Sequence, residues 1–509
     1  MAKVIMIQGT MSNVGKSLIV AGLCRILKQD GYKVAPFKSQ NMALNSFITE
    51  EGLEMSRAQV MQCEAAGIKP SVNMNPILLK PTNDMGSQVI VNGTVIGNFS
   101  AKEYFEKKKS FLPEIKKAYT ALKKQYDIIV VEGAGSPAEI NLKQNDIVNM
   151  GIAKLLRAPV ILVGDIDRGG VFAQIVGTMA LLEPSEQKRV KGFILNKFRG
   201  DVSLLQSGIT FLEQKCNNKV LGVIPYMNVD IEDEDSIAER LHSKKNKALL
   251  NIAVVRLPHI SNFTDFNRLE AIEGVSVYYA YKVEQLEYAD MIILPGTKNT
   301  IEDLLFIRQQ GIESAIKKLA NRGVIIFGIC GGYQMMGESI TDKYGVEKMG
   351  TIDGMGLLPV VTTFQPQKTM TRVRGKFLNI CGDLKELSGK PFYGYEIHMG
   401  ETKVIGEQHF YEIISDDNTV QKQGAYCQNC YGTYVHGIFD EEQTAKALLI
   451  ALCRKKDADS EKLLCHAVNW EEYKQRQYDI LAEIMRQNLD MNAIYDILMP
   501  KSHKNTVCN

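Results

Sequence analysis

Through the first half of the chain, short apolar runs alternate with longer stretches whose apolar residues recur at helical spacing. One such stretch, 18–28, places Ile19, Leu23, Ile26 and Leu27 on a single face and predicts a helix. Buried strands are predicted at the short apolar runs: 3–8, 32–37, 127–131, 159–163, 192–195 and 222–226. Strands and helices that alternate in this way predict a mostly parallel sheet covered on both faces.

A second alternating series follows a segment that is dense in charge. This segment, 230–247, predicts an exposed linker with a helical piece. Later strands and helices are expected at 251–257, 291–294, 323–327, 445–454 and 470–485. The chain is therefore predicted to hold an α/β domain at 1–229, a linker at 230–250, a second α/β domain at 251–444 and a helical C-terminal tail at 445–509.

Composition and charge add little to this picture. The chain has 509 residues, of which 45% are hydrophobic and 23% charged, as in ordinary soluble globular proteins. The 60 Lys and Arg residues nearly balance the 58 Asp and Glu residues, so no overall charge favours nucleic acid or an anionic membrane. The lysine-rich stretch 100–125 predicts one long helix with a solvated charged face.

The remaining compositional signals concern location and thiols. The first apolar run is too short for a signal peptide, and no stretch is long and apolar enough to cross a bilayer. Ten cysteines occur at irregular spacings, which favours reduced thiols. Cys427 and Cys430 form a CxxC pair, but a single pair is weak support for zinc. We therefore expect a cytoplasmic protein without a membrane or nucleic-acid partner.

The clearest chemical signal is Cys330. A strand-like apolar run ends at this thiol, Gly331 and Gly332 follow, and the next residues are helix-like. A sharp strand-to-helix turn exposes the side chain at its apex, and the N-terminus of the following helix favours a thiolate. A free cysteine can also be a small buried apolar residue, but that alternative does not explain the flanking glycines. The pattern predicts a nucleophile.

A thiol nucleophile requires a base, and the chain has seven histidines. His436 is favoured because it ends a strand-like stretch and precedes a glycine, whereas His398 and His259 remain alternatives. An oxyanion would also require backbone donors. Gly296, which follows another strand-like run, and Gly331 are the candidates.

The N-terminal loop 10–17 ends in the Gly-Lys-Ser of a phosphate-binding loop, between a predicted strand and a predicted helix. Its backbone N–H groups would bind phosphate oxygens, its lysine would reach the outer phosphates, and its serine hydroxyl would hold Mg²⁺. The first motif position is a threonine, with glycine one place earlier. The predicted nucleotide contacts are Thr10, Asn13, Gly15, Lys16 and Ser17.

Acidic residues follow two of the predicted strands. Glu132 stands at the end of an apolar run, and this edge of an open α/β sheet faces the ligand. Glu132 is therefore a candidate Mg²⁺ ligand together with Ser17, and a carboxylate that only caps a turn is the alternative. Asp165 and Asp167 follow the next strand, where a metal ligand, a substrate contact and a structural role stay open.

Longer motifs add a family resemblance. The segment 330–334 with a downstream histidine resembles the class I, triad-type glutamine amidotransferases, and segments 8–17 and 131–135 resemble the dethiobiotin synthetase-like P-loop ATPases. The two halves in this order resemble the cobyrinic and cobyric acid amidases of the cobalamin pathway. Further motifs resemble the cobyric acid synthase family most closely, and they occupy 164–170, 256–265, 294–300, 394–400 and 434–440.

The resemblance implies roles for individual residues. Cys330 matches the nucleophile, and His436 matches the general base. The ATP side is matched by Lys16, Ser17, Glu132 as the metal ligand, and Lys38 as the lysine that follows the second strand. Asp146 matches an acidic position that handles the substrate carboxylate. One position departs from the pattern: many class I glutaminases carry an acid two residues after the histidine, where this chain has Ile438. The third triad member is therefore unassigned.

The resemblance also implies an activity. An ATP-dependent amidoligase domain at 1–229 and a glutamine amidotransferase domain at 251–444 would amidate the b, d, e and g carboxylates of adenosylcobyrinic acid a,c-diamide. ATP and Mg²⁺ would be required, the partners would be small molecules, and cobalt would enter only with the corrinoid substrate. Two alternatives stay open: a cobyrinic acid a,c-diamide synthase, and a regulatory P-loop nucleotide switch with an inactive glutaminase domain. The oligomeric state is not predicted.

Overall fold

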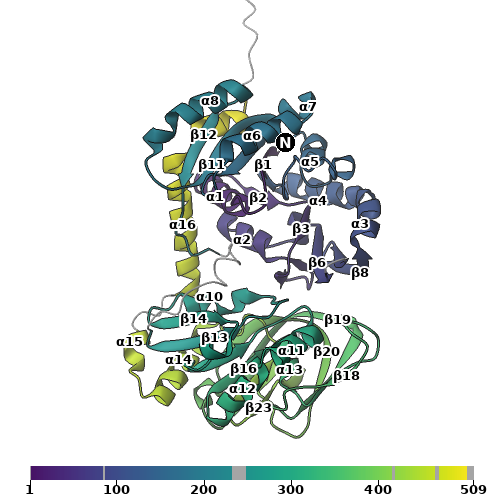
Figure 1. Cartoon of the computed structure of the whole chain (residues 1–509), viewed down its shortest axis with the longest axis vertical. Coiled ribbons are helices and arrows are strands. Elements are labelled where there is room, and N and C mark those ends of the chain that lie inside the picture. Colours follow the sequence, from purple (N-terminus) through teal and green to yellow (C-terminus); the bar gives the residue numbers. More distant parts are fainter. Residues whose placement is uncertain (1, 84–85, 232–247, 415–418, 465–468, 501–509) are drawn as a thin grey trace, which may run out of the picture. The chain divides into compact units, whose positions relative to one another are not determined.

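The computed structural model describes residues 2–83, 86–231, 248–414, 419–464 and 469–500. They form two compact α/β units, drawn in Figure 1, and neither unit is continuous in sequence. Unit 1 consists of Met1–Ala43, Glu54–Ser236 and Lys474–Asn509, and unit 2 consists of Leu44–Leu53 and Ile237–Tyr473. Most of the predicted linker at 230–250 lies outside the described residues.

A six-stranded sheet in the order β12-β11-β10-β1-β9-β2 forms the centre of unit 1, and every neighbouring pair is parallel. All residues of β2, β9 and β10 are buried, which explains why these strands read as continuous apolar runs. The predicted parallel sheet is confirmed. Its strands are β1 (Lys3–Gly9), β2 (Val34–Phe37), β9 (Ile128–Glu132), β10 (Val160–Asp165), β11 (Val190–Phe198) and β12 (Val220–Pro225).

Helices cover the sheet, and a small second sheet adjoins it. The helices of this part include α1 (Lys16–Gln29), α2 (Arg57–Ala66), α5 (Met150–Leu156), α6 (Val171–Leu181) and α8 (Gln206–Cys216). The second sheet has the order β3-β6-β7-β8 and is largely antiparallel; the periodicity of the sequence did not predict it. Its strands are β3 (Gln40–Met42), β6 (Ile77–Asn83), β7 (Gly86–Val91) and β8 (Thr94–Ser100).

The prediction of a single lysine-rich helix at 100–125 is wrong in one respect. The segment forms α3 (Ala101–Lys107), a 3₁₀ turn (Lys108–Phe111) and α4 (Leu112–Gln125). Proline in the first turn of α4 has no N–H to donate to a preceding turn, so it begins a new helix rather than continuing the old one. The predicted solvated face holds in α4, where Lys116, Lys117 and Lys124 are exposed.

Unit 2 is built on a second six-stranded sheet, in the order β14-β13-β15-β16-β24-β23. Its neighbouring pairs are parallel except the β23–β24 hairpin. The strands are β13 (Leu250–Val255), β14 (Val275–Ala280), β15 (Met291–Leu294), β16 (Ile325–Ile329), β23 (Ala425–Cys427) and β24 (Cys430–Thr433). A short helix, α13 (Gly331–Met335), begins directly after β16. The predicted second α/β domain is confirmed.

A second sheet of unit 2 was not predicted. It is dominated by the long antiparallel pair β19 (Val360–Phe377) and β20 (Pro391–Val404). Helices around both sheets include α11 (Thr300–Gln309), α12 (Ile312–Asn321) and α14 (Glu442–Lys456). The remaining strands of this second sheet are β17 (Ser339–Asp342), β18 (Gly350–Asp353), β21 (Tyr411–Ile414) and β22 (Val420–Gln423).

The predicted helical tail contributes to two cores. Helix α14 buries Leu448 and Leu452 in the core of unit 2. Farther along, α16 (Trp470–Asn488) buries Leu481 and Met485 in the core of unit 1, and α17 (Met491–Leu498) buries Ile494 and Leu498 there. The last residues of the described chain therefore stabilise the sheet that the first residues form.

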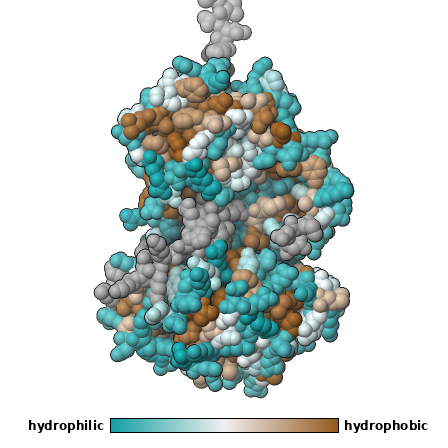
Figure 2. All heavy atoms as spheres, viewed as in Figure 1, coloured by the Kyte–Doolittle hydropathy of each residue, from teal (hydrophilic) through white to brown (hydrophobic). Residues whose placement is uncertain are grey.

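In the part of the chain that the structure describes, no helix combines the length and the apolar character needed to cross a bilayer. Figure 2 shows apolar surface on unit 1 near α6 and α8, where Val202, Leu204 and Phe211 are exposed. Single exposed apolar side chains of this kind are common on globular proteins.

Candidate active sites

Two neighbouring strands of unit 2 bring Cys330 and His436 together. Because β16 and β24 are parallel, with Ile329 opposite Thr433, the residues that follow them leave the same edge of the sheet. Cys330 has a φ of 51°, the strained backbone of a nucleophile elbow, and its N–H donates to the Thr433 carbonyl at 2.8 Å. A Cβ at Gly332 would lie 2.0 Å from the Leu294 carbonyl oxygen, so only glycine fits there.

A third residue, Asp265, completes this group. Its Oδ2 lies 2.8 Å from His436 Nδ1, and its Oδ1 accepts the Gly437 N–H at 2.9 Å. Both side chains are buried, Asp265 at 2% and His436 at 1% exposure. Burial alone would lower the pKa of His436, but the Asp265 carboxylate and hydrogen bonds to Asp265 and Cys330 raise it to about 10. His436 is therefore an imidazolium at neutral pH, the charged form that a neighbouring thiolate nucleophile requires.

The sequence interpretation missed Asp265. It noted that the usual position of the acid, two residues after the histidine, holds Ile438 in this chain, and it left the third member unassigned; Ile438 is a fully buried core residue in the structure. The available signal was an acid in the loop after β13, a parallel strand whose carboxyl end lies at the same sheet edge. Since Asp265 is 171 residues from His436, no local spacing relates the two.

The two alternative histidines make other contacts. His259 Nδ1 lies 2.7 Å from Asp303 Oδ1. His398 stacks on Tyr434 with ring centroids 3.8 Å apart, and its Nδ1 lies 2.8 Å from the Gly400 carbonyl. Neither shares a hydrogen bond with the thiol in the described part of the chain, which favours His436 as the base.

The two predicted oxyanion donors lie near Cys330 and His436. A Cβ added at Gly296 would be 2.9 Å from His436 Cε1, and one added at Gly331 would be 3.2 Å from the Thr297 nitrogen. Gly331 also begins α13, where backbone N–H groups lack helical partners. Gly296 therefore lies beside His436 and Gly331 directly follows Cys330, and their roles as oxyanion donors remain a prediction.

The phosphate-binding loop of unit 1 joins β1 to α1. Asn13 and Gly15 have φ values of 62° and 87°, which turn successive N–H groups inward as in an anion-binding loop. A Cβ at Gly15 would lie 2.4 Å from Asn196 Nδ2. Asn196 donates to the Val14 carbonyl at 2.8 Å, and Lys197 donates to the Asn13 carbonyl at 2.6 Å. These two residues of β11, which the sequence interpretation did not select, brace the loop.

The role left open for Asp165 has a structural answer. Asp165 is buried at the end of β10, and its Oδ2 lies 3.3 Å from Lys197 Nζ. Its Oδ1 accepts the Asp167 N–H at 2.9 Å, and Asp167 pairs with Arg199. Asp165 therefore orients the lysine that holds the phosphate-binding loop.

Glu132 lies at the centre of a buried polar cluster at the end of β9. Its Oε1 accepts from Lys38 Nζ at 2.8 Å and from Ser17 Oγ at 2.9 Å, and its Oε2 accepts from Gln62 Nε2 at 2.5 Å. Burial alone would raise the pKa of Glu132, but Lys38, Gln62 and the charge of Lys16 hold it below its ordinary value. An ionised carboxylate beside a serine hydroxyl is an oxygen donor set that suits Mg²⁺ shared with phosphates.

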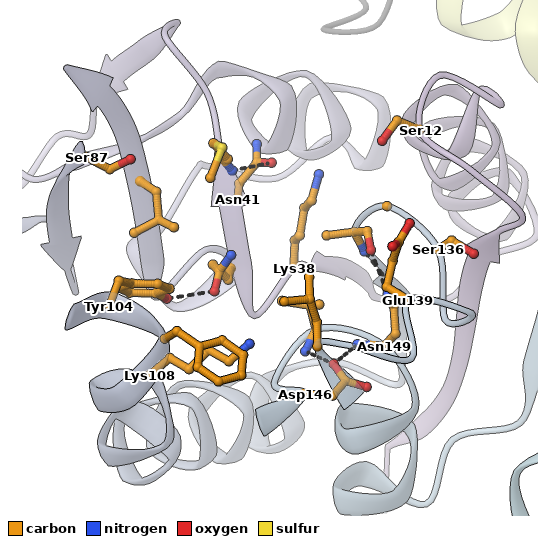
Figure 3. Close-up of a pocket in the computed structure, with 18 of the residues that line it drawn as sticks. Ser12, Lys38, Asn41, Ser87, Tyr104, Lys108, Ser136, Glu139, Asp146 and Asn149 are labelled. Carbon is orange, nitrogen blue, oxygen red and sulfur yellow. Dashed lines mark hydrogen bonds between the residues drawn. The ribbon is translucent and has the colours of Figure 1, made fainter. Parts of the chain in front are cut away.

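A pocket of about 780 Å³ within unit 1 is lined by Lys16, Ser17, Lys38 and Glu132, among others. In Figure 3, Tyr104 and Lys108 lie on one side of the pocket, and Ser12, Ser136 and Glu139 lie on the other. Tyr104 donates to Gln40 Oε1 at 2.6 Å. The apolar residues of the lining include Met42, Leu79, Phe99, Phe105 and Leu142. The pocket therefore combines charged and apolar lining.

Three further predicted residues can be placed. Asp146 lines the pocket, but its carboxylate accepts the N–H groups of Val148, Asn149 and Gly151 at 2.8 Å each, as a cap at the start of α5 does. Thr10 donates to Gln174 Oε1 at 3.1 Å. Cys427 and Cys430 face each other across a hairpin, and no cluster of metal ligands occurs among the described residues.

Known protein families match both halves of the chain. Residues 5–237 match the family described as the CobQ/CobB/MinD/ParA nucleotide binding domain, and residues 251–444 match the CobB/CobQ-like glutamine amidotransferase domain. The chain is 56% identical to the cobyric acid synthase of Lachnoclostridium phytofermentans, over 98% of this chain and 99% of the relative. It is 54% identical to that of Ruminiclostridium cellulolyticum, over 98% and 97%. The chain belongs to the cobyric acid synthase family.

Membership of the cobyric acid synthase family confirms the predicted fold class and nucleotide binding. The cobyric acid synthase of Clostridium acetobutylicum is a further relative, 51% identical over 97% of this chain and 98% of its own length. The predicted roles of individual residues remain predictions, and the geometry supports them unequally. Cys330, His436 and the cluster around Glu132 lie in arrangements that fit their roles, whereas Asp146 already has three backbone partners.

Proposed function

We propose that this member of the cobyric acid synthase family amidates the b, d, e and g carboxylates of adenosylcobyrinic acid a,c-diamide to give adenosylcobyric acid. Glutamine supplies the nitrogen, and ATP activates each carboxylate. The observation that carries the proposal is that one chain holds both a Cys330–His436–Asp265 group and a phosphate-binding loop beside Glu132 and Lys38. Carboxylates do not condense with ammonia unaided, so nitrogen supply and activation have to coexist.

The glutaminase half works by covalent catalysis. The Cys330 thiolate attacks the side-chain amide of glutamine, while the N–H groups of Gly296 and Gly331 stabilise the oxyanion. His436, protonated through its contact with Asp265, donates a proton to the departing ammonia. Water, deprotonated by the now neutral imidazole, then hydrolyses the thioester, releases glutamate and restores the thiolate.

The amidoligase half activates the acceptor. Lys16 and the N–H groups of the phosphate-binding loop hold the triphosphate, and Lys38 offsets charge near the phosphates. A corrinoid carboxylate attacks the terminal phosphate to form an acyl phosphate and ADP. Ammonia displaces phosphate from this group, which leaves an amide. The apolar lining of the pocket, with Phe99 and Phe105, suits the faces of a large macrocycle.

Ser17 and Glu132 would hold Mg²⁺. Their oxygens lie 2.9 Å apart, and Lys38 and Gln62 keep the carboxylate ionised and oriented. The ion, when bound, supplies charge neutralisation on the phosphates during transfer. Ser17 and Glu132 therefore share the buried end of the pocket with Lys16.

The alternatives are not favoured. The relatives compared above are all cobyric acid synthases at 51–56% identity over nearly their whole length, which opposes a cobyrinic acid a,c-diamide synthase. The Cys330–His436–Asp265 geometry opposes a switch with an inactive glutaminase domain. The substrates are small molecules, and the cytoplasmic location and the absence of a nucleic-acid partner stay predictions.

Product analysis by mass spectrometry tests the proposal. With adenosylcobyrinic acid a,c-diamide, ATP, Mg²⁺ and glutamine, we expect a product that has gained four amides. Cys330→Ala should lose this reaction with glutamine and keep it with ammonium chloride, and Cys381→Ala, an exposed thiol, is the matched control. A product without added amides from either nitrogen source would refute the proposed function.

A further inference from the structure

Residues 44–53 belong to unit 2, although they lie inside the 5–237 match to the nucleotide binding domain. The residues on either side, up to Ala43 and from Glu54 onward, belong to unit 1. The segment contains the short strand β4 (Ser46–Ile48) and a turn in which the Thr49 N–H donates to the Leu53 carbonyl at 2.8 Å. A piece of the nucleotide-binding half of the sequence is therefore packed among glutaminase residues.

The segment first contacts the loop that carries Asp265. The Asn262 N–H donates to Asn45 Oδ1 at 2.6 Å, and the Ser46 N–H donates to Asn262 Oδ1 at 3.4 Å. Asn262 has a φ of 52° and precedes the 3₁₀ turn Phe263–Phe266, and its carbonyl accepts the Asp265 N–H at 3.1 Å. Asn45 and Asn262 are both buried. Asn45 thus holds the residue from which the Asp265 turn starts.

The second contact reaches the ring of His436. Tyr395 donates its hydroxyl to the Ser46 carbonyl at 3.0 Å, and its ring stacks on the imidazole with centroids 5.4 Å apart. The backbones of Tyr395 and His436 also exchange two hydrogen bonds, of 3.1 and 2.9 Å. Phe47 and Ile48 pack against Tyr395 from the segment side. Tyr395 is therefore fixed between the segment and the base.

We infer that segment 44–53 is a positioning element of the glutaminase site, acting through Asn45 on Asp265 and through Tyr395 on His436. The inference deepens the proposed function and rests on it, because it assigns a further part to the same glutamine-hydrolysing group. Asn45 and Tyr395 touch neither glutamine nor the thiol in this role. They hold the carboxylate and the imidazole in the geometry that the proton transfers require.

The physical reason is that both contacts are buried and directional. Without Asn45 Oδ1, the N–H of Asn262 loses its acceptor inside the protein, and the turn that carries Asp265 can shift to regain one. Without the Tyr395 hydroxyl, the stacked ring loses its tie to Ser46. A displacement on the order of 1 Å at a catalytic group reduces turnover by roughly 10²-fold. Substrate binding depends less on these contacts.

The test uses the full-length chain and measures kcat and KM for glutamine hydrolysis. We expect Asn45→Ala and Tyr395→Phe to lower kcat roughly 10- to 100-fold with KM within about twofold of wild type. Amidation from ammonium chloride should stay within about twofold, since it does not use Cys330. Glu51→Gln, an exposed residue of the same segment, and Tyr393→Phe, an exposed tyrosine two residues before Tyr395, are the matched controls.

The outcomes separate the inference from the proposed function. Wild-type kcat in Tyr395→Phe and in a folded Asn45→Ala would overturn the inference alone, provided that Cys330→Ala is inactive with glutamine. Equal losses with glutamine and with ammonia would also overturn it, because they indicate a general structural role. If Asn45→Ala does not fold, Tyr395→Phe, which removes one oxygen atom only, decides the question.

Discussion

The glutaminase site of unit 2 and the nucleotide pocket of unit 1 both stand at the carboxyl ends of parallel strands, yet they hold their charged groups differently. Cys330, His436 and Asp265 are buried, and His436 is hydrogen-bonded to Asp265 at 2.8 Å. In unit 1, Lys38 pairs with Glu132 and Lys16 donates to the Met11 carbonyl at 3.0 Å, beside a pocket of about 780 Å³. The charged groups of the first site pair within the protein, whereas those of the second line a pocket in which a ligand could replace their partners.

This difference follows from the chemistry that each site performs. A buried thiolate and a buried imidazolium stabilise each other, because the attraction between the two charges offsets the desolvation free energy of each. Phosphate binding needs cations that are not permanently neutralised, so their partners have to be groups that a triphosphate or Mg²⁺ can replace. Variants at the two sites should therefore fail in different ways.

The largest effect is expected for Asp265→Asn. The loss of the carboxylate lowers the pKa of His436 from about 10, so the basic limb of the pH profile for glutamine hydrolysis should move to lower pH. We expect kcat to fall roughly 10²- to 10⁴-fold, with ammonia-driven amidation unchanged. Asp353→Asn, on the exposed strand β18, is the control. An unshifted pH profile would show that another group orients His436.

The contact between His436 and Asp265 also affects the stability of the folded protein. The pKa of His436 is higher in the folded protein than the ordinary value of 6.5. The stability that the pair contributes is therefore complete below about pH 6.5 and is lost as the pH rises toward about 10. Asp265→Asn should remove this dependence, which thermal unfolding of both proteins across pH 6 to 10 would reveal.

A smaller effect is expected for Lys16→Ala, and it should fall on unit 1 alone. Amidation should decrease roughly 10²- to 10³-fold from glutamine and from ammonia alike, because the outer phosphates lose their cation. Glutamine hydrolysis should stay within about threefold of wild type. Lys117→Ala on the exposed face of α4 is the control. Ammonia-driven amidation near the wild-type rate would remove the phosphate-binding loop from the mechanism.

The smallest change is expected for Glu132→Gln, which keeps the shape of the side chain and removes its charge. Lys38 then lies buried without this carboxylate, and we expect unit 1 to lose about 3 kcal/mol of stability while unit 2 keeps its own. Hydrogen–deuterium exchange should become faster in β1 and β9 but not in β16. Amidation should also require a higher Mg²⁺ concentration. Glu106→Gln, an exposed carboxylate, is the control.

The pH dependence of this loss has a defined sign. Because the pKa of Glu132 is depressed in the folded state, its contribution is present above about pH 4.5 and is lost as the pH falls below that value. The difference in stability between Glu132→Gln and wild type should therefore become smaller at acidic pH. A difference that stays constant as the pH falls well below 4.5 would mean that packing, rather than charge, dominates at this position.

Sequence reasoning succeeded where the chemistry and the backbone conformation are encoded together. The elbow at Cys330 and the loop before Ser17 each combine a strand end, small residues and a reactive side chain within a few positions. It was less successful where the partners are distant, as for Asp265, which lies 171 residues from His436. It also missed a break in the helix predicted at 100–125, where a 3₁₀ turn separates α3 from α4. The role that the resemblance implies for Asp146, whose carboxylate accepts three backbone N–H groups, remains a prediction.

By itself, the sequence determined that the chain holds two α/β domains, and it predicted a phosphate-binding loop and a thiol nucleophile within them, because periodicity and local motifs report on neighbouring residues. Only the tertiary structure decided that Asp265 orients His436 and that segment 44–53 packs beside them. These pairings join residues 171 and 217 positions apart. They depend on strand order and on how buried hydrogen bonds are satisfied in three dimensions, and no local pattern records either.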